Sequence, residues 1–152
     1  MIMELKKLYN MYTVELLNES KFAKPVILNW FKQQMLNSFQ GTELTKEQIE
    51  QYIEDTLAEK TFVELININP RMMFDVFDEN EIIIYHIVFP TPNGISFSSS
   101  IHQGRDKFIP ASGGALYKTR KEAELSGIIE ATKILNNKLE QLEKDKNLTN
   151  EV

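Results

Sequence analysis

Few side chains in this 152-residue sequence have the types and spacing that catalysis requires. It contains two histidines, His86 and His102, and no cysteine, which excludes thiolate nucleophiles, disulfides and cysteine-based metal sites. Residues 98–100 are three consecutive serines, and a serine needs a nearby base such as histidine before it becomes a nucleophile. No nucleophile motif surrounds them. We therefore predict no catalytic residue; the alternative is a small enzyme in which His102 acts as an acid or base.

Metal binding is predicted to be absent as well. Asp75, Asp78 and Glu79 lie close together, but they lack the glycine and the final glutamate of a calcium-binding loop. We interpret them as an acidic turn before a strand. His86 lies within an apolar stretch and is interpreted as a hydrogen-bonded core residue. The sequence therefore predicts no metal site and no cofactor.

Basic residues gather between residues 102 and 121, although the whole chain has a net charge of −5. A helix that begins near Thr119 would present unpaired backbone N–H groups beside these cations, which suits an anion. The alternative is a turn with a solvated basic rim, because the two glycines at 113 and 114 do not match a phosphate-binding loop. The net negative charge argues against nonspecific coating of nucleic acid.

These observations predict one ligand-binding surface, which joins the polar face of a strand to the basic start of the last helix. It comprises Ser98, Ser100, His102, Arg105, Lys107, Lys118, Arg120 and Lys121.

Apolar residues at helical spacing predict that residues 1–69 are helical. A first helix is expected within residues 4–17, and Pro25 suits the first turn of a second. Thr45 and Gln48 form a capping box for a third. A fourth is expected to begin at Thr61 and to end before Pro70, and residues 71–77 fit a helix or a strand equally well.

A β-hairpin follows, with strands at residues 81–89 and 95–101 joined by the turn 90–94. If Phe89 pairs with Ile95, the even-numbered residues of both strands share one face, and Ser98, Ser100 and His102 lie there beside His86. The first strand is apolar on both sides and is expected to be central in the sheet. The second is half polar and is expected nearer an edge.

The last helix is predicted from the capping box Thr119–Glu122 onward, with small residues that permit close packing on the sheet. The fold class is therefore α+β: N-terminal helices, a small antiparallel sheet and a long C-terminal helix packed on it. A single domain is expected over residues 1–144, with a helical part (1–69), a hairpin-plus-helix part (80–144) and a frayed tail (145–152). The leucines of the last helix fit a homo-oligomer through this helix and core packing against the N-terminal helices equally well.

Two resemblances bear on function. The segment LYKTRKEAELSGIIEATKIL and the preceding hairpin, residues 81–136, resemble the C-terminal half of a double-stranded-RNA-binding domain. That resemblance implies phosphate contacts from Arg120 and Lys121. The stretch NPRMMFDVFDEN, the hairpin and the last helix are similar to small uncharacterised proteins encoded by phages and mobile elements of Bacteroidetes-like bacteria. This second resemblance implies a viral or mobile-element origin and no mechanism.

The function predicted is that of a non-catalytic binding protein, phage- or mobile-element-encoded, which captures a host protein or a small anionic ligand. The alternatives are an RNA-binding module that uses Lys118, Arg120 and Lys121, and the small enzyme named above. The longest apolar run, residues 82–90, is shorter than the roughly 20 residues of a membrane helix. The N-terminus also lacks a signal-peptide core. We therefore expect a cytoplasmic protein without a membrane partner.

Overall fold

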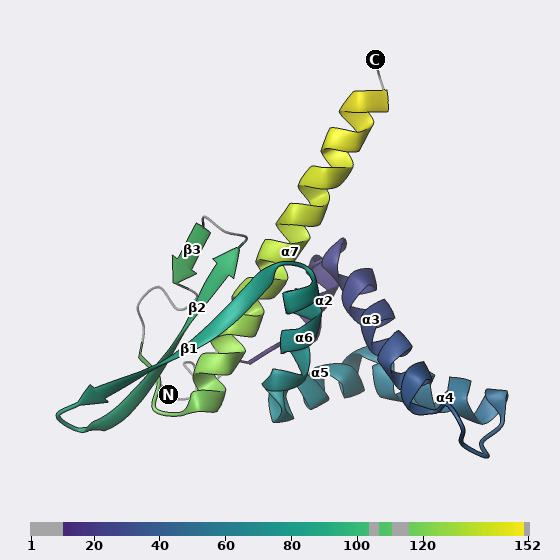
Figure 1. Cartoon of the computed structure of the whole chain (residues 1–152), viewed down its shortest axis with the longest axis horizontal. Helices are drawn as coiled ribbons and strands as arrows, with labels where there is room; N and C mark the ends of the chain where they lie inside the picture. The colour runs from purple at the N-terminus through teal and green to yellow at the C-terminus, as the bar shows by residue number, and fades with distance from the viewer. Residues whose placement is uncertain (1–10, 104–106, 111–115, 151–152) are drawn as a thin grey trace.

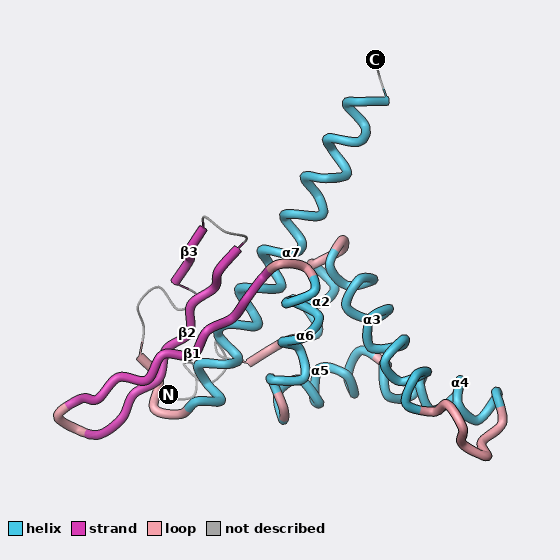
Figure 2. Tube along the Cα trace, viewed as in Figure 1, coloured by secondary structure: helices cyan, strands magenta, loops and turns pink. Residues whose placement is uncertain are grey.

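The computed structural model describes residues 11–103, 107–110 and 116–150 of the chain; for 107–110 it describes the backbone alone. The predicted α+β class is confirmed. Helices come first, an antiparallel sheet follows, and a long C-terminal helix packs on the sheet (Figures 1 and 2).

The first part of the chain is helical, as predicted, but two boundaries differ. Its elements are α2 (Val14–Glu19), α3 (Ala23–Ser38), α4 (Lys46–Leu57), α5 (Glu59–Ile68), the 3₁₀ helix η1 (Pro70–Met73) and α6 (Phe74–Glu79). The Thr45–Gln48 capping box at α4 is confirmed. Thr61 is not a cap, because α5 begins two residues earlier, after Ala58. The expected first helix does not extend through residues 11–13; α2 begins after Thr13, whose hydroxyl accepts from the Leu16 N–H at 3.0 Å.

The strands are β1 (Ile82–Thr91), β2 (Gly94–Gln103) and β3 (Lys107–Pro110), in the order β1-β2-β3. Two predictions are wrong here. The central strand is β2, and β1 lies at an edge. Pro90 pairs with Ile95, so the register differs by one residue from the predicted Phe89–Ile95 pairing. Because an edge strand tolerates proline, β1 continues through Pro90 and the turn is reduced to residues 92 and 93.

Because side chains alternate along a strand, this one-residue difference in register changes which residues of β2 share a face with a given residue of β1. We call the face toward the last helix the inner face and the opposite one the outer face. The inner face carries Ile82, Ile84, His86 and Val88 of β1 with Phe97, Ser99 and Ile101 of β2. The outer face carries Ile83, Tyr85, Ile87 and Phe89 of β1 with Ser96, Ser98, Ser100 and His102 of β2.

The last helix, α7 (Arg120–Asn150), crosses the inner face and then projects away from the body of the molecule (Figure 1). The hydroxyl of Thr119 accepts from the Glu122 N–H at 3.2 Å, as the capping box predicts. Gly127 permits close contact, since a Cβ there would lie 2.8 Å from Ile84 Cγ2. The expected frayed tail is wrong for residues 145–150, which are helical; residues 151 and 152 lie outside the described part.

The hydrophobic core forms where α7 meets the inner face and the N-terminal helices. Its largest fully buried side chains are Tyr12, Leu17, Ile27, Phe62, Ile66, Met73, Val76, Phe77, Ile82, Ile101, Ile128 and Leu135. Both predicted parts of the chain, 1–69 and 80–144, therefore contribute to one core. Among the described helices, none has the length and apolar character that crossing a bilayer requires.

Candidate interaction surface

The serines of the predicted ligand surface are not accessible. Ser98 and Ser100 are only 6% and 4% exposed, so their expected exposure is wrong. The reason is the strand order: β2 is central, and Ser100 lies between Tyr85 of β1 and Pro110 of β3. His102 is half-buried on the same face, and its ring lies edge-on to Tyr85 with centroids 6.2 Å apart.

The basic residues at the start of α7 lie on the other side of the sheet. Lys118, Arg120 and Lys121 are exposed, and the Arg120 guanidinium carbon lies 5.8 Å from the centroid of the Phe97 ring, a cation–π distance. Phe97 belongs to the inner face, whereas His102 belongs to the outer face. The structure therefore does not bring these two groups onto one surface.

The structure does not describe the side chains of two further residues of the predicted surface. Arg105 lies outside the described residues. Lys107 is the first residue of β3, and its side chain is outside them as well.

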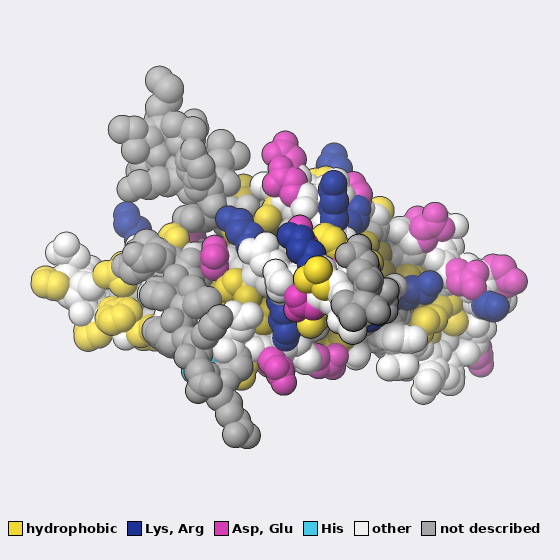
Figure 3. All heavy atoms as spheres, turned by 90° about the horizontal axis from the view of Figure 1, so that it is seen from above, with side chains coloured by type: hydrophobic (Ala, Val, Ile, Leu, Met, Phe, Trp, Pro, Cys, Tyr) yellow, Lys and Arg dark blue, Asp and Glu magenta, His cyan; other side chains and the backbone are white. Residues whose placement is uncertain are grey.

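The end of the β1–β2 hairpin is a surface that the sequence analysis did not predict. We call residues 88–97 the hairpin arm. Arg120, the first residue of α7, lies at Phe97, so the arm extends past the start of this helix (Figure 1). Large apolar side chains are exposed on both faces of the arm: Val88 by 50% and Ile95 by 61% on the inner face, and Phe89 by 40% on the outer face. Hydrophobic side chains gather at this end in the space-filling view, at the left of Figure 3.

The hairpin also lacks charge. Charged residues make up 26% of the chain, yet β1, β2 and the turn between them contain no Asp, Glu, Lys or Arg. Edge strands of isolated proteins are ordinarily protected by such charges. The first strand was expected at the centre of the sheet because it is apolar on both sides. The strand order shows that burial does not explain the absence of charge.

Beneath the middle of the hairpin lies a polar cluster, which consists of the buried Ser99 and Glu124, the partly buried His86, and Arg71, whose side chain is 53% exposed. The Glu124 carboxylate, buried at 6% side-chain exposure, accepts from Arg71 Nε at 2.7 Å. His86 Nε2 lies 3.6 Å from the same carboxylate oxygen, and the His86 ring stacks on Phe74 with centroids 5.3 Å apart. The inner-face pairing places Ser99 directly across from His86.

The cluster is incompletely hydrogen-bonded. Neither His86 nitrogen has a hydrogen-bond partner among the described residues, and the same holds for the Ser99 hydroxyl. Both nitrogens are buried although 20% of the side chain is exposed, so the exposed part of the ring is its carbon edge. His86 is therefore a partly buried residue whose nitrogens are buried, and it is not the hydrogen-bonded core residue that the sequence suggested. Desolvation lowers the pKa of His86 below its ordinary value, with Glu124 acting in the opposite direction and Arg71 and Arg120 adding to the decrease.

The pairing of these groups could not be read from the sequence. Arg71 and Glu124 are 53 positions apart, and the residues around each match no motif. The inner-face position of His86 in the strand was the one available signal.

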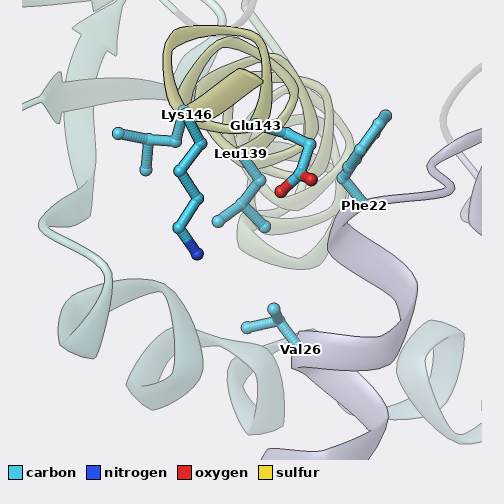
Figure 4. A pocket seen from close by; sticks show the side chains of 6 residues that line it. Phe22, Val26, Leu139, Glu143 and Lys146 are labelled. Atoms are coloured by element: carbon cyan, nitrogen blue, oxygen red, sulfur yellow. The ribbon is translucent and has the colours of Figure 1, made fainter. Parts of the chain in front are cut away.

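A second surface lies where α7 leaves the body. An open groove of about 450 Å³ is lined by Phe22, Val26, Leu139, Leu142, Glu143 and Lys146 (Figure 4). Beyond it, Leu142 and Leu148 are exposed on the projecting part of α7. The homo-oligomer expected through this helix remains a prediction.

No group of three or more His, Asp or Glu side chains among residues 11–103 and 116–149 is arranged to hold a metal ion. Comparisons of the chain with protein-family models, curated proteins and solved structures find no match.

Proposed function

We propose that the protein is a non-catalytic binding protein that engages a protein partner through the hairpin arm. The observation that carries this proposal is the exposure of Val88, Phe89 and Ile95 on an uncharged hairpin that projects past α7. Exposed apolar residues that cluster in this way are typical of protein interaction sites.

The composition of the arm supports a protein partner in particular. The centres of protein–protein interfaces are depleted of charged residues and enriched in aromatic ones. Phe89 and Phe97 supply aromatic area on the arm, and Tyr85 continues it along the outer face of β1. Binding here would bury apolar surface that the isolated chain leaves in water, with a stabilisation of roughly 25 cal/mol for each Å².

The exposed cations Lys118, Arg120 and Lys121 would serve a different class of partner, either RNA or a small anionic ligand. Such binding depends on released counterions and weakens steeply with added salt. Binding through the uncharged arm would depend little on salt. The two classes of partner are therefore distinguishable in one titration.

Site-specific photo-crosslinking in the cells that naturally express the protein tests the proposal. A photoreactive side chain is placed at Ile95 in the arm, and, as a matched control, at Leu148 of α7, which is similarly exposed (61% and 64%). We expect one predominant protein adduct that forms from position 95 and not from position 148. No protein adduct at position 95, or the same adduct from both positions, would contradict the proposal.

Affinity measurements on the crosslinked partner then test the role of the arm. The double substitution Phe89→Lys with Ile95→Lys should weaken binding at least tenfold, because it places two charges in an apolar contact. The control Leu142→Lys with Leu148→Lys should leave affinity unchanged. If the double substitution Arg120→Ala with Lys121→Ala weakens binding instead, and affinity falls steeply with added salt, the partner is of the anionic class. The proposal is then wrong.

A further inference from the structure

The polar cluster joins the hairpin to the rest of the molecule. His86 is on β1, Glu124 on α7 and Arg71 on η1, so one carboxylate connects three separate elements. Phe74 of α6 covers one side of the imidazole ring. Any movement of the base of β1 away from α7 must separate these groups.

We propose that His86 is a pH-sensitive latch, which holds the hairpin against α7 and η1 when its imidazole is neutral and loosens it when the imidazole is protonated. The inference concerns the docking of the hairpin and does not depend on what the arm binds. If the proposed function holds, the latch would also make the position of the arm depend on pH.

The surroundings of the ring favour the neutral form. An imidazolium ion donates from both nitrogens. Nδ1 has no acceptor among the described residues, and Nε2 lies 3.6 Å from Glu124 Oε1, beyond an ordinary hydrogen bond. That oxygen accepts a hydrogen bond from Arg71 Nε at 2.7 Å. Placing a charge on this largely desolvated ring, with so few hydrogen-bond partners, is therefore unfavourable.

Among the described residues, three charged groups act on His86. Glu124, from α7, attracts a proton on the ring, whereas Arg71 from η1 and Arg120 from α7 repel it. Desolvation is the largest effect, and it also opposes protonation. The docked hairpin therefore binds fewer protons than the open one below the ordinary histidine pKa of 6.5, and docking weakens as the pH falls through that value.

Native-state hydrogen exchange of the hairpin tests the latch. The readout is the opening constant of the Ile84 and Ile101 amides, corrected for the intrinsic exchange rate at each pH. A group that must be neutral in the docked state raises this constant up to about tenfold at one pH unit below its ordinary pKa. We expect this constant to rise between pH 7.5 and 5.5, by less than this tenfold limit. An unchanged opening constant would overturn the proposal.

Substitutions assign the effect to His86. The variant His86→Gln should abolish the pH dependence, whereas His102→Gln, on the outer face, should behave as the parent chain does. A pH dependence retained in full by His86→Gln would contradict the latch. His86→Phe, which can still stack on Phe74, provides a second non-titrating variant if the glutamine variant does not fold.

Titration of the parent protein followed by NMR of the two histidine rings needs no variant that could misfold. We expect the His86 ring to titrate below 6.5 and Glu124→Gln to lower that midpoint further, because the carboxylate favours the proton. A His86 midpoint at or above 6.5 would show that protonation does not loosen the hairpin.

Discussion

Two polar clusters hold α7 to the rest of the protein, and they differ in how completely their hydrogen bonds are formed. In the first, Tyr12 Oη and Thr132 Oγ1 lie 3.0 Å apart, and Thr132 also donates to the Ile128 carbonyl at 2.8 Å. Asn67 accepts from the Tyr12 N–H at 2.8 Å and donates to the Tyr12 carbonyl at 2.9 Å. In the second, the nitrogens of His86 and the hydroxyl of Ser99 have no hydrogen-bond partner among the described residues.

This difference indicates which cluster stabilises the fold and which one can respond to a change of pH. A buried polar group contributes to stability when it is paired and lowers stability when it is not. The Tyr12 cluster therefore anchors the N-terminal segment to α7. The His86 cluster supplies no hydrogen bond from His86 or Ser99 among the described residues, and its Arg71–Glu124 ion pair joins η1 to α7, so packing attaches the hairpin here and this is the weaker of the two attachments. The projecting arm belongs to the weakly attached element.

The largest effect is expected from a substitution of Asn67, which belongs to the hydrogen-bonded Tyr12 cluster. Asn67→Ala removes both hydrogen bonds to the Tyr12 backbone and leaves a partly buried N–H and C=O unpaired. We expect a loss of about 2–4 kcal/mol in the free energy of unfolding, measured by denaturant titration. A loss below about 0.5 kcal/mol, typical of an ordinary surface substitution, would show that this cluster is not an anchor.

A change of pH should affect the first cluster at the alkaline end. Burial raises the pKa of Tyr12 from 10.0 to about 12. The unfolded chain therefore loses this proton first, and stability decreases as the pH rises from 10 toward 12. Between pH 9 and 11 we expect a loss of about 1.4 kcal/mol, from 1.36 kcal/mol per pKa unit. The same titration of Tyr12→Phe should lack this component; an identical profile for the two proteins would refute the assignment.

The contact between α7 and the hairpin can be tested at Gly127. Alanine normally stabilises a helix relative to glycine by about 1 kcal/mol. Here the new Cβ would lie 2.8 Å from Ile84 Cγ2 and 3.3 Å from Ser99 Cβ, atoms that belong to β-strand residues and cannot move aside freely. We expect Gly127→Ala to destabilise the fold by about 1 kcal/mol net. The control Asn137→Ala, at an exposed position of α7, should be neutral or slightly stabilising.

The smallest effects are expected from removing one hydroxyl group from each cluster. Thr132→Val leaves the buried Tyr12 hydroxyl without its partner and should cost about 1 kcal/mol. Ser99→Ala removes a buried hydroxyl that has no partner, so its free energy of unfolding should change by less than about 0.5 kcal/mol or increase. Equal costs for the two substitutions, from parallel thermal melts, would remove the distinction between the clusters.

Several sequence predictions were confirmed because they depended on short-range interactions. The capping boxes at Thr45 and Thr119 involve residues three positions apart, and both of these threonines accept the expected backbone hydrogen bond. The hairpin and the long last helix were predicted from periodicity. By contrast, the pairing register was wrong by one residue, because Pro90 continues the strand where the sequence suggested that a turn begins.

The candidate surface was harder to predict than the fold. Ser98 and Ser100 were expected to be exposed because they are polar, but the exposure of a short side chain depends on which strands flank it. The exposed arm was overlooked because an apolar strand resembles a buried one in sequence. His86 was placed in the protein interior, but its neighbours Arg71 and Glu124 come from distant parts of the chain.

The sequence by itself determined most of the helices and the two long strands, where several helices begin and that the hairpin carries no charge. These features depend on hydrogen bonds within a few residues and on residue composition. Only the tertiary structure decided which strand is central, which face meets α7 and which charged groups surround His86. Those features depend on contacts between segments far apart in the chain, where a shift of one residue in register exchanges the side chains that meet.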